Sequence, residues 1–292
     1  MSMTKTMRRV LLAACVALGT ACMAVHAADV PKATMESMQI PSHGKLMNGM
    51  VYVAAGAGPH PVVILLHGFP GNERNLDLAQ DMRRAGWDVL YFNYRGAWGT
   101  PGDFSFGNGI EDVASAIAYL RAPANAARLR LDPARIVLVG HSMGGFMAVH
   151  GAAADPAIKG VAMISGADLA DRFQQLRSTS DAAGAVKTMG ALLAKEGMAP
   201  LAGCTGDSLA RELSQHGPAW TFTAKAGAMR GRPLLVVTSD DGLAPTDDAF
   251  ADAVRKAGDP HVATVHLPTD HAYSDQRMEL SQAVLKWLAT LQ

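Results

Sequence analysis

Short continuous runs of apolar residues, separated by longer segments with helical periodicity, constrain the fold of this chain more than any other feature. The clearest run, 62–66, contains only valine, isoleucine and leucine, which is typical of a strand buried on both faces. Further strands are predicted at 46–53, 88–94, 135–139, 159–164, 233–237 and 261–267, with helices at 75–85, 110–120, 143–154, 247–257 and 278–291. This alternation predicts an α/β fold, in which a mainly parallel sheet is covered by helices on both faces.

The composition supports a buried core and argues against polyanionic partners. Apolar residues make up 49% of the 292 residues and charged residues 18%, so the chain has enough apolar material for one large domain. The basic and acidic residues number 26 each, and neither sign forms a block or stripe. We therefore expect neither nucleic acid nor an anionic membrane surface as a partner.

The regular alternation stops between residues 166 and 232. This stretch has helical composition and no convincing strand, so residues 168–230 are predicted to form a helical cap inserted into a domain that spans residues 28–292. Its large apolar side chains either form the wall of an apolar pocket or pack the insertion itself. They are Met189, Met198, Met229, Trp220 and Phe222.

The first residues have the pattern of an export signal. Basic residues at positions 5, 8 and 9 precede a small, apolar stretch over 10–24, and Val25-His26-Ala27 places small residues where a signal peptidase cuts. We predict a signal peptide over 1–27, cleaved after Ala27 or Ala28, and a periplasmic or secreted protein without stable membrane association. An uncleaved anchor is the alternative, although the stretch is short for a membrane span.

Cysteines add little to this interpretation. Cys15 or Cys22 could anchor a lipoprotein only if a lipobox preceded it, and the residues before each of them match a lipobox poorly. Both leave with the predicted signal, so the mature chain would keep Cys204 alone and could form no intrachain disulfide. No histidine motif lies beside Cys204, and we interpret it as a structural thiol.

Gly140-His141-Ser142-Met143-Gly144 is the motif with the most chemical content. It follows one predicted strand directly and opens a predicted helix, the setting that a nucleophile elbow requires. Glycines on either side of the serine allow the strand and the helix to approach closely. We therefore predict that Ser142 is a nucleophile. The alternative is a glycine-rich turn whose serine has no chemical role.

A second glycine-containing loop, His67-Gly68-Phe69-Pro70-Gly71, follows the strand at 62–66. Attack by a serine on an acyl carbon creates a negative oxygen, which preorganised N–H donors must meet. The backbone N–H groups of Met143 and Phe69 are the predicted donors of this oxyanion hole, because Pro70 has no N–H. The loop could also be an ordinary tight turn, and His67 is interpreted as a structural residue of that turn.

An acid and a base are expected to follow the serine in that order. Asp241 comes after the strand at 233–237 and His271 after the strand at 261–267, so both belong to the sheet edge that carries Ser142. A histidine transfers protons near neutral pH, and a carboxylate fixes its tautomer. Asp240 and Asp168 are the rival acids, and the aspartates at 240 and 241 could also cap the next helix.

Together these runs resemble the α/β-hydrolase superfamily, in particular its esterase and prolyl-oligopeptidase-like branch, over residues 38–292. The resemblance implies a serine hydrolase that forms an acyl-enzyme on Ser142 with His271 as base and Asp241 as its orienting acid. Hydrolysis of small carboxylic esters is the expected activity, with peptidase or amidase action on small peptides as the alternative. A non-catalytic binding protein on the same scaffold is a third possibility, against which the intact set argues.

The loop after residue 94 also resembles that branch, and it carries Trp98, Phe104 and Phe106. These side chains could line the substrate pocket or pack the loop onto the core, and both alternatives stay open. Arg95 is expected to pair with Asp103 or Glu111. We expect no metal and no cofactor, because the sequence contains no metal-ligand spacing and no nucleotide-binding glycine motif. The sequence indicates no oligomeric state.

Overall fold

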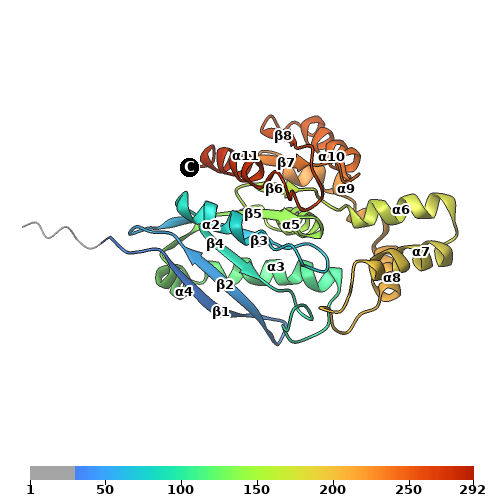
Figure 1. Ribbon diagram of the computed structural model, residues 1–292, viewed down its shortest axis with the longest axis horizontal. Coiled ribbons are helices and arrows are strands. Elements are labelled where there is room, and N and C mark those ends of the chain that lie inside the picture. The colour runs from blue at the N-terminus through green and yellow to red at the C-terminus, as the bar shows by residue number, and fades with distance from the viewer. Residues whose placement is uncertain (1–29) are drawn as a thin grey trace, which may run out of the picture. The chain divides into compact units, whose positions relative to one another are not determined.

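An eight-stranded sheet is the framework of the computed structural model, which describes residues 30–292 (Figure 1). The predicted signal peptide over 1–27 and its cleavage point lie outside the described residues. The strands are β1 Thr34–Ser42, β2 Lys45–Val53, β3 His60–Leu66, β4 Asp88–Phe92, β5 Leu131–His141, β6 Val161–Ile164, β7 Leu234–Thr238 and β8 Val262–His266. None of the helices in this part of the chain has the length and apolar character needed to cross a membrane.

The sheet is mainly parallel, which confirms the predicted α/β class. Its strand order is β1-β2-β4-β3-β5-β6-β7-β8, and only the β1–β2 and β2–β4 pairs are antiparallel. All seven residues of β3 are buried, because helices cover both faces of the sheet. Successive side chains of β3 therefore enter two separate cores: Ile64 lies in one and Leu65 in the other.

Two groups of helices cover the two faces (Figure 1). The helices α2 Leu76–Arg84 and α11 Arg277–Ala289 pack on one face, around the fully buried Val284 and Met82. The other face is covered by α3 Phe106–Arg121, α4 Pro123–Leu129, α5 Met143–Ala154 and α10 Ala244–Lys256. The carboxyl ends of the parallel strands stay uncovered by these two groups, and this edge carries the predicted chemistry.

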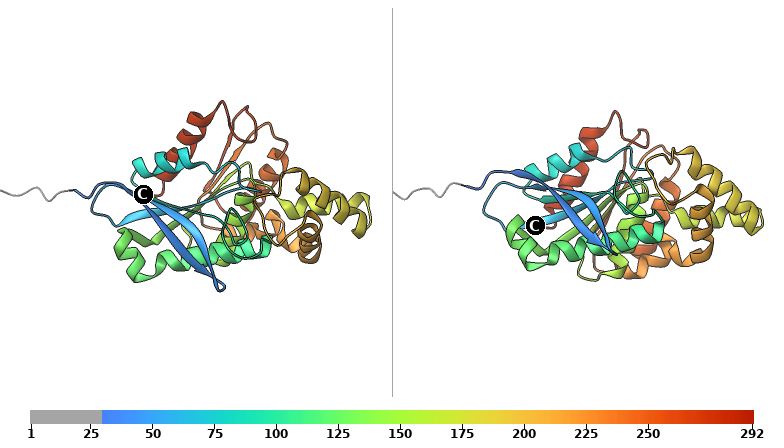
Figure 2. Two further views of the ribbon diagram at one scale, coloured as in Figure 1. Left: turned by 60° about the horizontal axis from the view of Figure 1, so that its bottom comes forward. Right: turned by 90° about the horizontal axis from the view of Figure 1, so that it is seen from below.

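Several helices fill the stretch between β6 and β7. They are α6 Leu169–Thr179, α7 Ala182–Lys195, α8 Gly206–His216 and α9 Phe222–Lys225, with the short turns η1 Gly217–Trp220 and η2 Ala226–Met229. Figure 2 shows α6, α7 and α8 gathered beside the end of the sheet. Within 168–230 no residue belongs to a named strand, and a single bridge joins Leu201 to Ala97.

Main-chain hydrogen bonds attach this insertion to the loop after β4. Trp98 N donates to Pro200 O at 2.9 Å, Ala202 N donates to Gly96 O at 2.7 Å, and Phe104 N donates to Ala202 O at 2.9 Å. These three hydrogen bonds therefore fix residues 200–202 of the insertion to the loop over 96–104. They also give partners to backbone N–H and C=O groups, which a folded chain must pair wherever they are buried.

Candidate active site

The turn that carries Ser142 has the geometry of a nucleophile elbow. Ser142 stands between the end of β5 and the start of α5, with φ 58° and ψ −123°, a conformation that a residue with a side chain adopts at a cost. A Cβ on Gly140 would lie 2.0 Å from Gly144 O, and one on Gly144 would lie 2.0 Å from Leu66 O. Only glycine fits at either position, which explains the spacing in the sequence.

The sheet edge brings Asp241 and His271 together. His271 Nδ1 lies 2.7 Å from Asp241 Oδ2, and the Asp241 side chain is 5% exposed. Burial raises the pKa of Asp241, but the hydrogen bonds from His271 and from Leu243 N–H, together with the nearby Ser165 and Ser239 hydroxyls, outweigh it and hold that pKa below its ordinary value. The ionised carboxylate accepts a hydrogen bond from the Nδ1–H group of His271, so Nε2 is left as the nitrogen that can accept a proton.

Neither rival aspartate contacts His271. Asp240 has a 64% exposed side chain that lies 3.2 Å from His266 Nε2. Asp168 caps α6 by accepting from Asp171 N at 2.9 Å, and it also accepts from Phe222 N at 2.6 Å. Burial raises the pKa of Asp168 to about 6. Of the three acids proposed from the sequence, Asp241 alone has the geometry to orient the base.

The loop after β3 lies directly against the elbow. A Cβ on Gly68 would be 3.0 Å from Ser142 Cβ, so a side chain at position 68 would crowd Ser142 and the backbone of this loop lies close to it. Among residues 30–292, the backbone N–H groups of Phe69 and Met143 have no hydrogen-bond acceptor. Both residues line the same pocket as Ser142. Two N–H donors without an acceptor, in the pocket that Ser142 lines, are what the predicted oxyanion hole would require.

A pocket of about 670 Å³ opens above these groups, and Ser142, Asp241 and His271 line it. In the described part of the chain, no hydrogen bond joins Ser142 Oγ to His271, although both side chains reach the pocket. Its outer wall comes from one face of α6 and one face of α7, at the three- and four-residue spacing of a helix. Those side chains are Leu169, Arg172, Gln175, Met189, Leu192, Leu193 and Glu196.

The sequence left open whether the large apolar residues of the insertion line a pocket or pack the insertion. One of them, Met189, lines this pocket. Phe222 and Met229 are fully buried in the core, and Met198 and Trp220 pack against it.

The aromatic residues of the loop after β4 pack against the loop that carries Phe69 and Pro70. Phe104 is 2% exposed and Phe106 is fully buried, and their rings lie 6.0 and 6.2 Å from the ring of Phe69. Trp98 Nε1 donates to Pro70 O at 2.7 Å. None of the three belongs to the pocket lining. Of the two alternatives left open by the sequence, the structure favours packing, in which these side chains hold the Phe69 loop.

His67 and Arg95, which belong to the motifs described from the sequence, are held by contacts within the fold. His67 is buried, its Nδ1 lies 2.8 Å from Gly68 O, and burial lowers its pKa to about 4. Arg95 is bound by Glu111 at 2.6 Å and by Asp112 at 2.5 Å. Glu111 was one of its two expected partners. Asp103 is not a partner, because Asp112 of α3 binds the guanidinium instead.

Sequence reasoning missed His141 and three hydroxyl residues near the acid. His141 Nε2 lies 2.8 Å from His271 O, and burial lowers the pKa of His141 to about 4. The neutral ring therefore donates to the main chain of the base. Ser165 and Ser239 follow β6 and β7 directly, and Tyr273 follows the base by two residues. Their positions just after strands were the available signal, since polar residues there reach the edge that carries a site.

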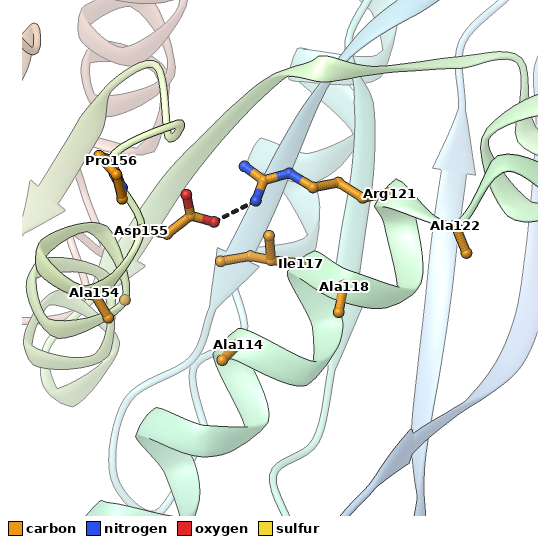
Figure 3. Close-up of a pocket in the computed structure, with 9 residues that line it drawn as sticks. Ala114, Ile117, Ala118, Arg121, Ala122, Ala154, Asp155 and Pro156 are labelled. Carbon is orange, nitrogen blue, oxygen red and sulfur yellow. Dashed lines mark hydrogen bonds and ion pairs between the residues drawn. The ribbon is translucent and has the colours of Figure 1, made fainter.

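A second hollow lies between α3 and the end of α5 (Figure 3). It has a volume of about 610 Å³, and an ion pair between Arg121 and Asp155 crosses it. Its lining contains no serine, cysteine or histidine, so it offers no nucleophile and base. Over residues 30–292, no group of three or more His, Cys, Asp or Glu side chains could hold a metal ion.

Known proteins resemble this chain in sequence and in fold. The family model of the alpha/beta hydrolase family matches residues 63–283. Two curated relatives, both uncharacterized proteins of Mycobacterium tuberculosis (strains CDC 1551 / Oshkosh and ATCC 25618 / H37Rv), are 31% identical over 107 residues. That match covers 36% of this chain and 36% of each relative, so the chain spans about a third of their length.

Solved structures share the fold over most of their length. A highly thermostable carboxyl esterase from Bacillus coagulans is 16% identical with a TM-score of 0.67, over 88% of this chain and 99% of that one. A thermophilic carboxylesterase cloned from a metagenomic library is 20% identical with a TM-score of 0.63, over 90% of this chain and 91% of that one. The elbow, the sheet and the family match over most of the chain agree: this protein belongs to the alpha/beta hydrolase family.

Proposed function

We propose that this protein is an esterase that hydrolyses small carboxylic esters through an acyl-enzyme on Ser142. The contact of 2.7 Å between His271 Nδ1 and the buried Asp241 carboxylate, in the pocket that Ser142 lines, is the observation that carries the proposal. A structural histidine would not require an oriented, ionised carboxylate behind it and an open pocket in front of it.

In the proposed reaction, His271 Nε2 removes the proton of Ser142 as its oxygen attacks the acyl carbon of the ester. The carbonyl oxygen becomes negative and accepts hydrogen bonds from the N–H groups of Phe69 and Met143. His271 then gives its proton to the leaving alcohol. A water that His271 deprotonates attacks the acyl-enzyme and releases the acid.

The character of the pocket supports a small, mainly apolar substrate. Leu169, Met189, Leu192 and Leu193 face it from the insertion, and Arg172 and Glu196 bring charge to the same wall. Esterases with this fold, such as the one from Bacillus coagulans, support the assignment by analogy. A peptidase needs a site for an extended chain, and no feature of this pocket favours that alternative.

We also propose that the protein is exported, on the sequence pattern of residues 1–27 alone. Expression of the full chain in a diderm bacterium, followed by mass spectrometry of the periplasmic fraction, tests this. A mass that corresponds to residues 28–292 or 29–292 is expected, whereas an unprocessed chain in the cytoplasm would refute export.

The activity is tested with p-nitrophenyl acetate, butyrate and octanoate and with a fluorophosphonate probe. We expect turnover and labelling by the wild-type protein and loss of both in Ser142→Ala. Ser178→Ala, which alters an exposed serine of α6, is the matched control and should behave as wild type. Labelling without ester turnover, together with cleavage of peptide p-nitroanilides, would favour a peptidase. A folded wild-type protein that shows neither labelling nor turnover would refute the proposal.

A further inference from the structure

The loop that carries Phe69 depends on side chains for its position. Residues 68–72 of this loop lie between the end of β3 and the start of α2. Within residues 30–292, none of their backbone groups forms a hydrogen bond with another backbone group. The sheet therefore does not fix this stretch, and the side chains that bind its carbonyl oxygens decide which way its N–H groups point.

Three side chains bind carbonyl oxygens of this loop, and one of them comes from a distant segment. Two of the contacts are local, because a neighbouring histidine and a neighbouring arginine bind Gly68 O and Gly71 O at 2.8 and 3.4 Å. Trp98 Nε1 donates to Pro70 O at 2.7 Å, across 28 residues of sequence. In the part of the chain that the structure describes, this is the one hydrogen bond that ties residues 68–72 to a segment far away in sequence.

Trp98 is itself held firmly in this position. It has φ 50°, in the left-handed region that residues with large side chains rarely adopt. Its backbone N donates to Pro200 O at 2.9 Å, and the Arg74 guanidinium lies 4.3 Å from the centre of its ring. A Cβ on Gly71 would lie 2.8 Å from Trp98 Nε1. Such backbone strain persists where the surroundings over-determine it, and it concentrates at functional sites.

Trp98 contacts both the insertion and the loop that carries Phe69. Its backbone binds Pro200 of the insertion, and its indole N–H binds Pro70 O. The side chain does not belong to the pocket lining, so a contact with substrate does not explain it. Packing alone does not explain it either, because a phenylalanine would cover the loop but would leave the carbonyl of the buried Pro70 without this donor.

We propose that Trp98 is a positioning residue for the oxyanion hole. Its indole N–H fixes Pro70, and this holds the N–H of the preceding residue, Phe69, in the pocket where the carbonyl oxygen of a bound ester becomes negative. The inference rests on the proposed esterase function. Donors stabilise a developing charge best when they are aligned before the reaction begins, and a loop that is free to turn loses part of that stabilisation.

The test compares Trp98→Phe with wild type in hydrolysis of p-nitrophenyl acetate. We expect kcat to fall about tenfold and KM to stay within about twofold, because the Phe69 N–H is displaced rather than removed. Trp87→Phe is the matched control. Trp87 is 1% exposed in the core that packs under α2 and α11, and its Nε1 has no hydrogen-bond partner among the described residues. This variant should keep the wild-type kcat.

A transition-state analogue separates positioning of the oxyanion hole from general damage to the site. When an alkyl trifluoromethyl ketone binds, Ser142 Oγ bonds to the carbonyl carbon, the serine proton passes to His271, and the ketone oxygen becomes the negative group that the hole stabilises. The corresponding trifluoromethyl alcohol cannot form this adduct. For Trp98→Phe we expect the Ki of the ketone to rise about tenfold and the Ki of the alcohol to stay within about twofold.

Two results would overturn the inference: an unchanged kcat in Trp98→Phe, or an equal rise in Ki for the ketone and for the alcohol. If Trp98→Phe does not fold, as judged by circular dichroism, incorporation of benzothienylalanine at position 98 carries the test. This residue keeps the shape of the indole and replaces its N–H with sulfur, and the same criteria apply to it.

The two levels of inference fail separately. Absence of Ser142-dependent hydrolysis in wild type removes the proposed function and this inference with it. Normal wild-type turnover with either overturning result removes the positioning role of Trp98 alone.

Discussion

The same substitution should have a large effect on kcat at Asp241 and almost none at the adjacent Asp240. Asp241→Asn is expected to lower kcat by a factor on the order of 10³ to 10⁴, with little change in KM. Each factor of ten corresponds to about 1.4 kcal/mol of transition-state stabilisation, so the expected loss is about 4 to 5.5 kcal/mol. Asp240→Asn should leave kcat within about twofold of wild type.

The difference in magnitude follows from the contacts. The Asp241 side chain is 5% exposed and lies 2.7 Å from His271 Nδ1, where an ionised acceptor fixes the tautomer and stabilises the imidazolium. An asparagine amide can donate toward Nδ1 and thus favours the tautomer that protonates Nε2, which then cannot accept the proton of Ser142. Asp240 is 64% exposed and faces His266 at 3.2 Å, and a surface pair of this kind contributes about 0 to 1 kcal/mol to stability.

The assay is steady-state hydrolysis of p-nitrophenyl butyrate, with active sites counted by fluorophosphonate labelling and folding checked by thermal denaturation. Asp168→Asn is a useful third variant, because Asp168 accepts two backbone N–H groups. Its loss should appear as lower stability, about 1 to 2 kcal/mol, rather than as a collapse of kcat. A loss of kcat in Asp240→Asn or Asp168→Asn that equals the loss in Asp241→Asn would refute the assignment of the acid.

Three further predictions follow from the elbow, the pocket and the acid. Gly144→Ala should lower the free energy of unfolding, measured in urea, by about 3 kcal/mol or more, because the new Cβ would lie 2.0 Å from Leu66 O. At Gly227 a Cβ would meet no atom within 4 Å, so Gly227→Ala should change the free energy of unfolding little, and equal effects of the two substitutions would contradict the packing argument. Leu192→Trp would fill part of the pocket. The kcat/KM for p-nitrophenyl octanoate should therefore fall at least about tenfold more than the kcat/KM for p-nitrophenyl acetate. An equal fall in kcat/KM for both esters would show that the acyl group binds elsewhere. The pKa of Asp241 is below its ordinary value in the folded protein, so the ionised carboxylate stabilises the fold above about pH 4, and this contribution disappears as the pH falls further. Between pH 7 and pH 3 the Tm of wild type should therefore fall by more than the Tm of Asp241→Asn. An equal fall in the two proteins would contradict the prediction.

Buried elements with strong patterns were predictable from the sequence. The helix expected at 143–154 has the same bounds in the structure, because a strand and a glycine-flanked turn fix its start. The first strand, β1 Thr34–Ser42, was missed. It is an antiparallel edge strand in which most side chains are exposed, so it carries no apolar run. The short helix α4 was also missed, since a seven-residue helix shows little periodicity.

The candidate site was predictable only in part, and the reason is spatial. Ser142, Asp241 and His271 each follow a strand, so the order of elements alone brings them to one edge. Ser165 and Ser239 follow β6 and β7 directly, so their positions place them at the same edge, but no local pattern shows which of the groups there lie beside Asp241. For the aromatic residues of the loop over 98–106, the sequence left pocket lining and packing both open, because composition alone does not separate them. The structure places Phe104 and Phe106 in the core.

The attachment of the insertion to the loop after β4 bears on how such a protein can change over generations. Three hydrogen bonds hold Pro200 and Ala202 to the loop over 96–104, and every one of them joins main-chain atoms. Backbone groups are the same in every residue except proline, so these three hydrogen bonds do not depend on the side chains at positions 98, 200 and 202. Gly96 is an exception, because a Cβ there would lie 2.2 Å from Phe104 N. The exposed side chains of the pocket wall on α6, Arg172 and Gln175, can therefore change over generations while the attachment of the insertion to this loop persists.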